Sequence, residues 1–226
     1  TCLVEIDEEP PHAIDPNSLT KSLQFCKMVQ SHISPVIQVM RKTVVDGSNT
    51  SGFQRTALIG RGGAIDTSAG PVRIANISLE EDAGKIVSET GEVKTYKLDR
   101  LGIPLIEIGT APDIKTPQQC QEAAKKIGML LRSIPDIKRG LGTIRQDVNV
   151  SIRDGARIEI KGAQDIKMVP LLVELEAKRQ LELLKIKKEF YGYRLNEFKI
   201  VDLSVILKDC KSKIVTKTQE NEGKIL

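Results

Sequence analysis

Alternation of apolar and polar residues predicts most of the strands in this chain. It runs through residues 72–79 and 103–108, and a period of two is typical of strands with one buried face. Further strands are expected at residues 2–6, 35–45, 54–59, 94–98, 143–152 and 157–161. Because short turns rich in glycine join several of these segments, we expect an antiparallel sheet.

Helical spacing of apolar residues appears in three segments, at residues 18–33, 116–134 and about 169–189. Thr116 and Pro117 open the second helix as its cap and first helical residue. The stripe expected to be buried on the third helix is Leu171, Leu172, Leu175, Arg179, Leu183 and Ile186. After Tyr191 the pattern weakens, and we expect a strand at 200–205 and a turn at 217–224. The predicted fold class is α+β, an antiparallel sheet with flanking helices.

Composition narrows the setting without naming a function. The chain has 226 residues, 40% of them hydrophobic, and no apolar run of membrane-spanning length. Its four cysteines are scattered, which argues against a zinc site and favours a reduced, cytoplasmic protein. A net charge of +4 permits an RNA partner without requiring one, whereas 3% aromatic residues are too few for base-stacking platforms.

Several catalytic patterns are absent from the sequence. It contains no P-loop and no G-x-S-x-G nucleophile motif. Its two histidines do not form a ligand-like pair, so amide hydrolysis has no obvious nucleophile here. Any ammonia used by this protein would therefore come from another chain.

Two carboxylates are the main candidates for chemistry. Glu81 lies in the acidic motif LEEDAGK at 79–85, and Glu107 lies inside the apolar run 104–108. A buried carboxylate needs a partner, and Mg²⁺ is commonly held by one or two carboxylates together with substrate phosphates. We therefore predict that two strands bring Glu81 and Glu107 to one metal ion. The alternative is a solvated strand end, with Glu107 also facing water.

A polar loop and two polar strand faces supply further candidates. The loop at 46–52 is either a flexible hairpin or a ligand-holding loop, with Arg41 and Lys42 facing phosphate. The segments 143–152 and 157–161 present polar residues on one face, which is either a solvated surface or the floor of a groove for a charged substrate. The candidate nucleotide- or substrate-binding residues are Arg41, Lys42, Ser51, Gln54, Lys85, Asn149 and Lys161, and Arg145 and Asp147 are added to Glu81 and Glu107 as candidate catalytic residues.

Long motifs in a fixed order resemble a known family. They are DEEPPH at 7–12, RKTVVDGSNTSGFQRT at 41–56, LEEDAGK at 79–85, DRLGIPLIEI at 99–108, APDI at 111–114, GTIRQDVNVS at 142–151 and RIEIKG at 157–162. Together they resemble the B/E-type subunits of tRNA-dependent amidotransferases, and the upstream motifs resemble the archaeal GatE type more than the bacterial GatB type. The resemblance is dense over residues 1–190 and loose beyond them.

The resemblance implies a fold and an activity. The fold is a cradle-like catalytic domain similar to that of glutamine synthetase and the guanidino kinases, with residues 1–190 as its central part and 191–226 leading into the next lobe. The activity is that of a carbon–nitrogen ligase that uses ATP and Mg²⁺ to phosphorylate glutamate misacylated onto tRNA(Gln). Ammonia then comes from an asparaginase-like partner, GatD. The family's metal-ligand motifs match Glu81 and Glu107.

One departure from the family pattern leads to a further expectation. The family begins with a strand carrying a Glu-x-His pair, whose histidine is a metal ligand, and the residues from Thr1 onward do not supply it. We therefore expect an incomplete metal site and little or no activity of this chain alone. A non-catalytic tRNA-binding or docking module is the alternative, and a small-molecule ligase of the glutamine synthetase type is a remote third.

Overall fold

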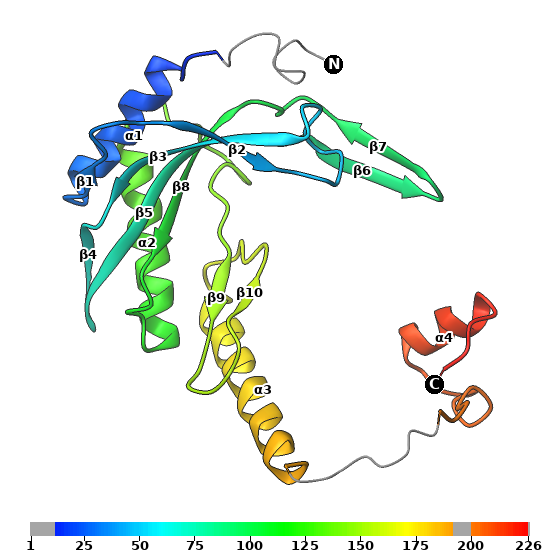
Figure 1. Ribbon diagram of the computed structural model, residues 1–226. Helices are drawn as coiled ribbons and strands as arrows, with labels where there is room; N and C mark the ends of the chain where they lie inside the picture. The colour runs from blue at the N-terminus through cyan, green and yellow to red at the C-terminus, as the bar shows by residue number, and fades with distance from the viewer. Residues whose placement is uncertain (1–11, 192–199, 226) are drawn as a thin grey trace. The chain divides into compact units, whose positions relative to one another are not determined.

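The computed structural model describes residues 12–191 and 200–225 (Figure 1). The predicted strand at 2–6 lies outside these residues. The chain divides into two compact units, Thr1–Leu181 and Glu182–Leu226. In the part of the chain that is described, no helix is both long enough and apolar enough to cross a membrane.

The first unit is built on a six-stranded antiparallel sheet. Its strands are β1 (His32–Ile33), β2 (Val39–Thr43), β3 (Phe53–Arg61), β4 (Ala64–Thr67), β5 (Gly70–Glu81) and β8 (Pro104–Thr110). They follow the order β1-β3-β5-β4, with β2 beside β3 and β8 beside β5. Two smaller antiparallel pairs accompany the sheet, β6 (Lys85–Thr90) with β7 (Val93–Lys97), and β9 (Val148–Val150) with β10 (Ile158–Ile160). These pairings confirm the predicted antiparallel sheet of an α+β fold.

Helices α1 (Pro16–Met28) and α2 (Pro117–Ser133) form one core with the sheet. Phe25 from α1 and Ile77 from β5 are fully buried in it, and each such side chain contributes about 1.5–3 kcal/mol relative to exposure. The sequence predicted that α1 continues to residue 33. It ends earlier because Gln30 adopts a left-handed backbone with φ 55°, which stops the helix before β1.

The start of α2 agrees with the sequence prediction. The Thr116 side chain accepts a hydrogen bond from the Gln119 N–H at 3.1 Å, and Pro117 is the first helical residue. This cap satisfies one of the otherwise unpaired N–H groups of the first turn. The position of α2 along the chain is therefore fixed by local chemistry, and its apolar face packs on the main core.

Helix α3 (Val169–Glu189) has the predicted bounds but a different buried face. Leu171, Leu175 and Leu183 are exposed, although they were predicted to be buried. A second core forms from Val148, Val150, Ala163 and Val169, with Leu172, Val173 and Ala177 packed against it. The β9–β10 pair is small and covers one narrow side of α3, so leucines elsewhere on the helix stay at the surface.

The second unit contains the end of α3 and helix α4 (Lys213–Glu220). Residues 200–205 form no strand, so that prediction is wrong. The segment 217–224, predicted as a turn, begins inside α4 and becomes a turn only after Glu220. Near the end of the unit, the Leu203 N–H donates to the Ile225 carbonyl at 2.8 Å.

Candidate active site

Glu80 and Glu107 lie together on the face of the sheet away from the main core. In the pairing of β5 with β8, Ser78 lies opposite Glu107 and Glu80 lies opposite Leu105. Residues directly opposite each other share a face, and so do residues two apart in one strand. A hydrogen bond with Glu80 raises the pKa of Glu107 to about 7, with burial and the negative charge of Glu80 acting in the same direction. Two carboxyl groups that share a proton are also close enough to share a cation.

Donors from β2 and β3 surround the carboxylate of Glu80. Lys42 Nζ lies 3.2 Å from Glu80 Oε1, and Thr56 Oγ1 donates to the same oxygen at 3.3 Å. Gln54 Nε2 donates to Glu80 Oε2 at 3.3 Å and to the Glu81 carbonyl at 2.8 Å. Glu80 is only 8% exposed, so these donors provide the compensation that a buried carboxylate requires.

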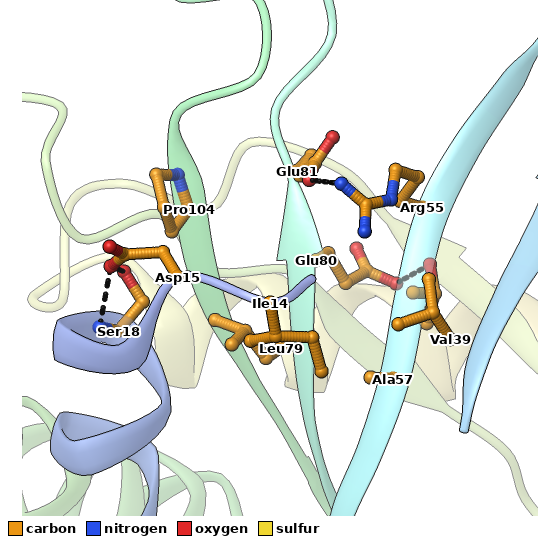
Figure 2. A pocket seen from close by; sticks show the side chains of 11 residues that line it. Ile14, Asp15, Ser18, Val39, Arg55, Ala57, Leu79, Glu80, Glu81 and Pro104 are labelled. Atoms are coloured by element: carbon orange, nitrogen blue, oxygen red, sulfur yellow. Dashed lines mark hydrogen bonds and ion pairs between the residues drawn. The ribbon is translucent and has the colours of Figure 1, made fainter. Parts of the chain in front are cut away.

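Glu81 does not join this pair. It lies opposite Pro104, one residue beyond Glu80, and so points to the other face of β5. There Arg55 Nη1 forms an ion pair with Glu81 Oε1 at 2.8 Å, as Figure 2 shows. The predicted convergence of Glu81 and Glu107 on one site is therefore wrong, and Glu80 occupies the position beside Glu107.

The Arg55–Glu81 pair lies at a small cavity on the same side of the sheet as α1 (Figure 2). The cavity measures about 40 Å³ and is lined by residues that include Ile14, Leu79 and Pro104. A space of this size holds about one water molecule. Arg55 Nε is buried and has no hydrogen-bond partner among the described residues.

The β9–β10 pair presents the predicted polar face. Asn149 lies opposite Glu159, and both are exposed, whereas their neighbours Val148 and Val150 are buried. Lys161 Nζ lies 3.8 Å from Glu159 Oε2 and is mostly exposed. The predicted pairing of two polar strand faces is confirmed for residues 148–150 and 158–160, whereas the prediction that the first strand begins at 143 and ends at 152 is wrong. A ligand-binding role for Asn149 and Lys161 stays a prediction.

Arg145 and Asp147 precede β9 and interact with residues distant in sequence. Arg145 Nη2 donates to Asp82 Oδ2 at 3.1 Å. Asp147 Oδ1 accepts a hydrogen bond from the Gly162 N–H at 2.8 Å. The negative charge of Asp147 also contributes to the raised pKa of Glu107, after the larger effects of Glu80 and burial. Asp147 is therefore electrostatically coupled to the Glu80–Glu107 pair, and Arg145 is joined to Asp82, two residues after Glu80.

The loop at 46–52 uses its hydroxyl groups internally. Ser51 Oγ donates to the Phe53 carbonyl at 2.8 Å, and Ser48 Oγ donates to Asp46 at 2.6 Å. The Arg41 guanidinium lies 4.8 Å from the centre of the Phe53 ring. Lys85, at the start of β6, is exposed. Two other predicted binding residues, Lys42 on β2 and Gln54 on β3, lie at Glu80. Ligand contacts by Arg41, Lys42, Ser51, Gln54 and Lys85 stay predictions.

The donor set at the carboxylate pair fits a hard divalent cation. Within residues 12–191 and 200–225, no group of three or more His, Cys, Asp or Glu side chains could hold a metal ion. Glu80 and Glu107 therefore offer two protein carboxylates. Mg²⁺ commonly takes one or two protein carboxylates and completes its coordination with other oxygen ligands, so the number and type of these two ligands agree with that pattern.

Glu80 was missed from the sequence, although a signal for it was present. Ile106 and Ile108 flank Glu107, and Ile77 and Leu79 precede Glu80 with the same spacing. When the isoleucines and Leu79 are assigned to the buried face, Glu107 and Glu80 both fall on the opposite face. Thr56 and Asp82 had no such signal, because their roles depend on partners 24 and 63 residues away.

Comparison with known proteins agrees with this architecture. Residues 5–223 match the family model described as the GatB/GatE catalytic domain. Three relatives carry the name of the E-type subunit of glutamyl-tRNA(Gln) amidotransferase. The protein from Methanocaldococcus jannaschii is 51% identical over all of this chain and 36% of its own length. The protein from Sulfurisphaera tokodaii is 51% identical over all of this chain and 37% of its own length. That from Archaeoglobus fulgidus is 49% identical over 95% of this chain and 35% of its own length.

The chain thus spans little more than a third of the length of the curated relatives that it matches. The family model, in contrast, covers nearly all of this chain. On the strength of that match and of identities near 50%, the chain belongs to the GatB/GatE catalytic-domain family.

Proposed function

We propose that this chain is the ATP-dependent phosphorylating domain of a GatE-type glutamyl-tRNA(Gln) amidotransferase. The observation that carries the proposal is the Glu80–Glu107 pair on the face away from the main core, with Lys42 beside it. A sheet whose apolar face is covered by helices and whose other face carries charge supports a cradle-like domain similar to that of glutamine synthetase and the guanidino kinases.

The proposed reaction has two steps. First, a carboxylate oxygen of the glutamyl group on tRNA attacks the γ-phosphorus of ATP, the bond to ADP breaks, and an acyl phosphate forms. Second, ammonia attacks the acyl carbon and phosphate leaves, giving Gln-tRNA(Gln). Enzymes accelerate phosphoryl transfer mainly by positioning groups and stabilising charge, which agrees with the absence of a strong nucleophile motif from this sequence.

Glu80 and Glu107 would hold Mg²⁺, which would neutralise charge on the nucleotide phosphates. Lys42 and Arg145 are the cations best placed to contact phosphate oxygens, because each is bonded to a carboxylate at or beside the site. Glu107 must lose its proton before a cation binds there, and its pKa is raised to about 7, first of all by its hydrogen bond with Glu80. We therefore expect the affinity for Mg²⁺ to increase as the pH rises through 7.

Ammonia and the tRNA substrate define the proposed partners. The sequence carries no motif for amide hydrolysis, so ammonia would come from a partner protein, and the family resemblance points to the asparaginase-like GatD. The tRNA would be tRNA(Gln) charged with glutamate, and the setting would be cytoplasmic translation. The chain covers about a third of its relatives' length, so binding of these partners is proposed for a protein of that full length.

A non-catalytic tRNA-binding role is the second candidate. It is favoured by one observation, the exposed lysines Lys185, Lys187 and Lys188 near the end of α3. Clustered lysines bind nucleic-acid phosphates through counterion release, and such binding weakens steeply with salt.

Calorimetric titration with a non-hydrolysable ATP analogue distinguishes the two roles. We expect Mg²⁺-dependent binding to the unaltered chain and a loss of roughly tenfold or more in affinity for Glu80→Gln and for Glu107→Gln. Glu81→Gln is the matched control, because Glu81 is the adjacent carboxylate on the other face, and its affinity should change by less than about threefold. Salt-sensitive RNA binding by a chain without nucleotide affinity would instead support the second role.

A further inference from the structure

Asp82 follows the last residue of β5 and is held rigidly by its own backbone. Its N–H donates to the Ile103 carbonyl at 2.8 Å, and its carbonyl accepts from the Gly102 N–H at 2.8 Å. Its side chain is only 12% exposed. The carboxylate of Asp82 is thus a nearly buried anion in a fixed position, two residues after Glu80.

The Asp82 carboxylate binds two guanidinium groups. Its Oδ2 accepts from Arg145 Nη2 at 3.1 Å and lies 3.7 Å from Arg100 Nε. Arg100 Nε also donates to the Ala83 carbonyl at 3.2 Å, and Asp82 Oδ1 accepts from the Ala83 N–H at 2.9 Å. Arg100 is therefore held by Asp82 and Ala83 in the connection between β5 and β6, whereas Arg145 comes from a segment 63 residues further along the chain.

The segment around Arg145 is anchored on its other side as well. Gln146 Nε2 donates to the Ala163 carbonyl at 2.7 Å, and the Ala163 N–H donates to the Gln146 carbonyl at 3.0 Å. These bonds attach the segment to the residues after β10. The Asp82–Arg145 bond attaches the segment to the end of β5, two residues after Glu80 of the carboxylate pair.

In the part of the chain that the structure describes, Asp82 is the one side chain bonded to the Arg145 guanidinium. A guanidinium has five N–H donors in a rigid fork, so one bond to Asp82 leaves the remaining donors for a ligand. The Arg145 side chain is 38% exposed, which keeps it accessible. A side chain held in this way loses less conformational entropy when it binds an anion.

We propose that Asp82 is a positioning residue that fixes Arg145 beside the Glu80–Glu107 pair, so that the guanidinium meets the phosphate oxygens of the nucleotide. This inference rests on the proposed function. A purely structural Asp82 would stabilise the connection at 82–84 between β5 and β6 together with Arg100, and would have no specific effect through Arg145. The two roles differ in whether the effect of changing Asp82 depends on Arg145.

A double-mutant cycle measures that dependence. The variants are Asp82→Asn, Arg145→Gln and the two combined, and the readout is the affinity for a fluorescent, non-hydrolysable ATP analogue with Mg²⁺. We expect Arg145→Gln to weaken binding roughly tenfold or more, and Asp82→Asn to weaken it roughly three- to tenfold. The combined variant should bind no more weakly than Arg145→Gln alone.

Three controls test whether a loss of nucleotide affinity in Asp82→Asn is specific. Asp113→Asn is the matched control, because it breaks an Asp–Arg pair with Arg73 elsewhere on β5 and should leave nucleotide affinity unchanged. Mn²⁺ affinity without nucleotide should also be unchanged in Asp82→Asn, which shows that the carboxylate site is intact. Where Asp82→Asn fails to fold in a thermal melt, Asp82→Glu replaces it in the same cycle, because it keeps the charge and moves it by one methylene.

The outcomes separate this inference from the proposed function. If the unaltered chain binds nucleotide and the two losses add in the combined variant, Asp82 acts independently of Arg145 and the positioning role is wrong. If the unaltered chain binds no nucleotide with Mg²⁺, the proposed function fails and the inference fails with it. If Asp82→Asn weakens nucleotide binding in the unaltered chain but not in Arg145→Gln, the result supports both the proposed function and the positioning role of Asp82.

Discussion

The two faces of the main sheet differ in composition although the same strands build them. On one face, Ala57 and Leu79 lie opposite each other and are buried with α1 and α2. On the other, their chain neighbours Thr56 and Glu80 lie opposite each other and are joined by a hydrogen bond. Strand β5 thus supplies stability with one residue and charge with the next. The comparison shows that a one-residue error in assigning a face exchanges a core position for a site position.

A register shift in β5 changes which residues of the strand face the core, from even-numbered residues before the shift to odd-numbered residues after it. Val72 and Ile74 are buried, and so are Ile77 and Leu79, although two residues lie between Ile74 and Ile77 where strict alternation allows one. The pairing with β8 shifts register between Ile74 and Asn76, where one extra residue is accommodated. The shift sets the face of every residue after it, including Glu80 and Glu81.

The largest expected effect comes from damaging the apolar face. Ile77→Ala should lower the free energy of unfolding by about 2–5 kcal/mol, because it removes a fully buried side chain and leaves a cavity. Gln54→Ala on the opposite face should lower it by about 1 kcal/mol or less. Urea titration of both variants tests the contrast, and equal losses would contradict the assignment of the two faces.

The second expected effect is a dependence of folding stability on pH, which should come from Glu107 on the polar face. Glu107 has a pKa raised to about 7, mainly by its hydrogen bond with Glu80, against 4.5 for an ordinary glutamate. A raised pKa means that the folded state binds the proton more tightly, so this contribution to stability is present below about pH 4.5 and is lost as the pH rises through 7. Glu80, Lys42 and Asp147 are the charged groups that act on Glu107.

Metal-free chain should therefore become less stable between pH 5 and pH 8, and Glu107→Gln should lose that part of the dependence. Thermal melts in chelator at several pH values measure it. Glu81→Gln serves as the control from the opposite face and should keep the dependence of the unaltered chain. A Glu107→Gln variant with an unchanged pH profile would show that Glu107 does not share a proton with Glu80.

A smaller change in stability is expected from the Arg55–Glu81 ion pair on the core-facing side of the sheet. Glu81→Gln should lower the free energy of unfolding by about 1 kcal/mol, because Arg55, whose side chain is 18% exposed, loses its charged partner. Chemical denaturation at low and high salt measures the loss, which should shrink as salt screens the pair. A stability unchanged by the substitution at low salt would mean that the pair contributes nothing.

The smallest expected change in stability comes from the ion pair between Arg73, in the first half of β5, and Asp113. Asp113 accepts from Arg73 Nε at 2.9 Å and from Arg73 Nη2 at 2.7 Å. These bonds lower the pKa of Asp113 to about 2. A lowered pKa gives a contribution to stability that is present above about pH 4 and is lost as the pH falls through 2. Asp113→Asn should slightly lower the melting temperature at pH 7, and by pH 2 the difference from the unaltered chain should narrow.

The sequence predicts those elements whose ends are set by local chemistry. The bounds of α3 and the cap of α2 at Thr116 and Pro117 were predicted correctly, because capping and helical spacing depend on nearby residues. The early end of α1 depends on the backbone of Gln30, and no strong local signal marks it. Helix α4 was missed because its short polar segment resembles a turn.

The candidate site was harder to predict because its contacts are distant in sequence. Glu107 was identified from its apolar neighbours, but its partner was taken as Glu81 in place of Glu80. The buried face of α3 was wrong for a related reason. Gln180 Nε2 donates to Glu176 Oε1 and to the Val150 carbonyl, so both polar side chains are buried. A pattern based on hydrophobicity cannot anticipate polar residues that are buried through such bonds.

The proposal that Glu80 and Glu107 hold a divalent ion is tested most directly by locating that ion. A crystal of the chain with Mn²⁺ and a non-hydrolysable ATP analogue, measured for anomalous scattering, gives the position of the ion. We predict one peak between the carboxylates of Glu80 and Glu107 and none at Glu81. A peak at Glu81, or nucleotide bound with no metal at the Glu80–Glu107 pair, would contradict the claim.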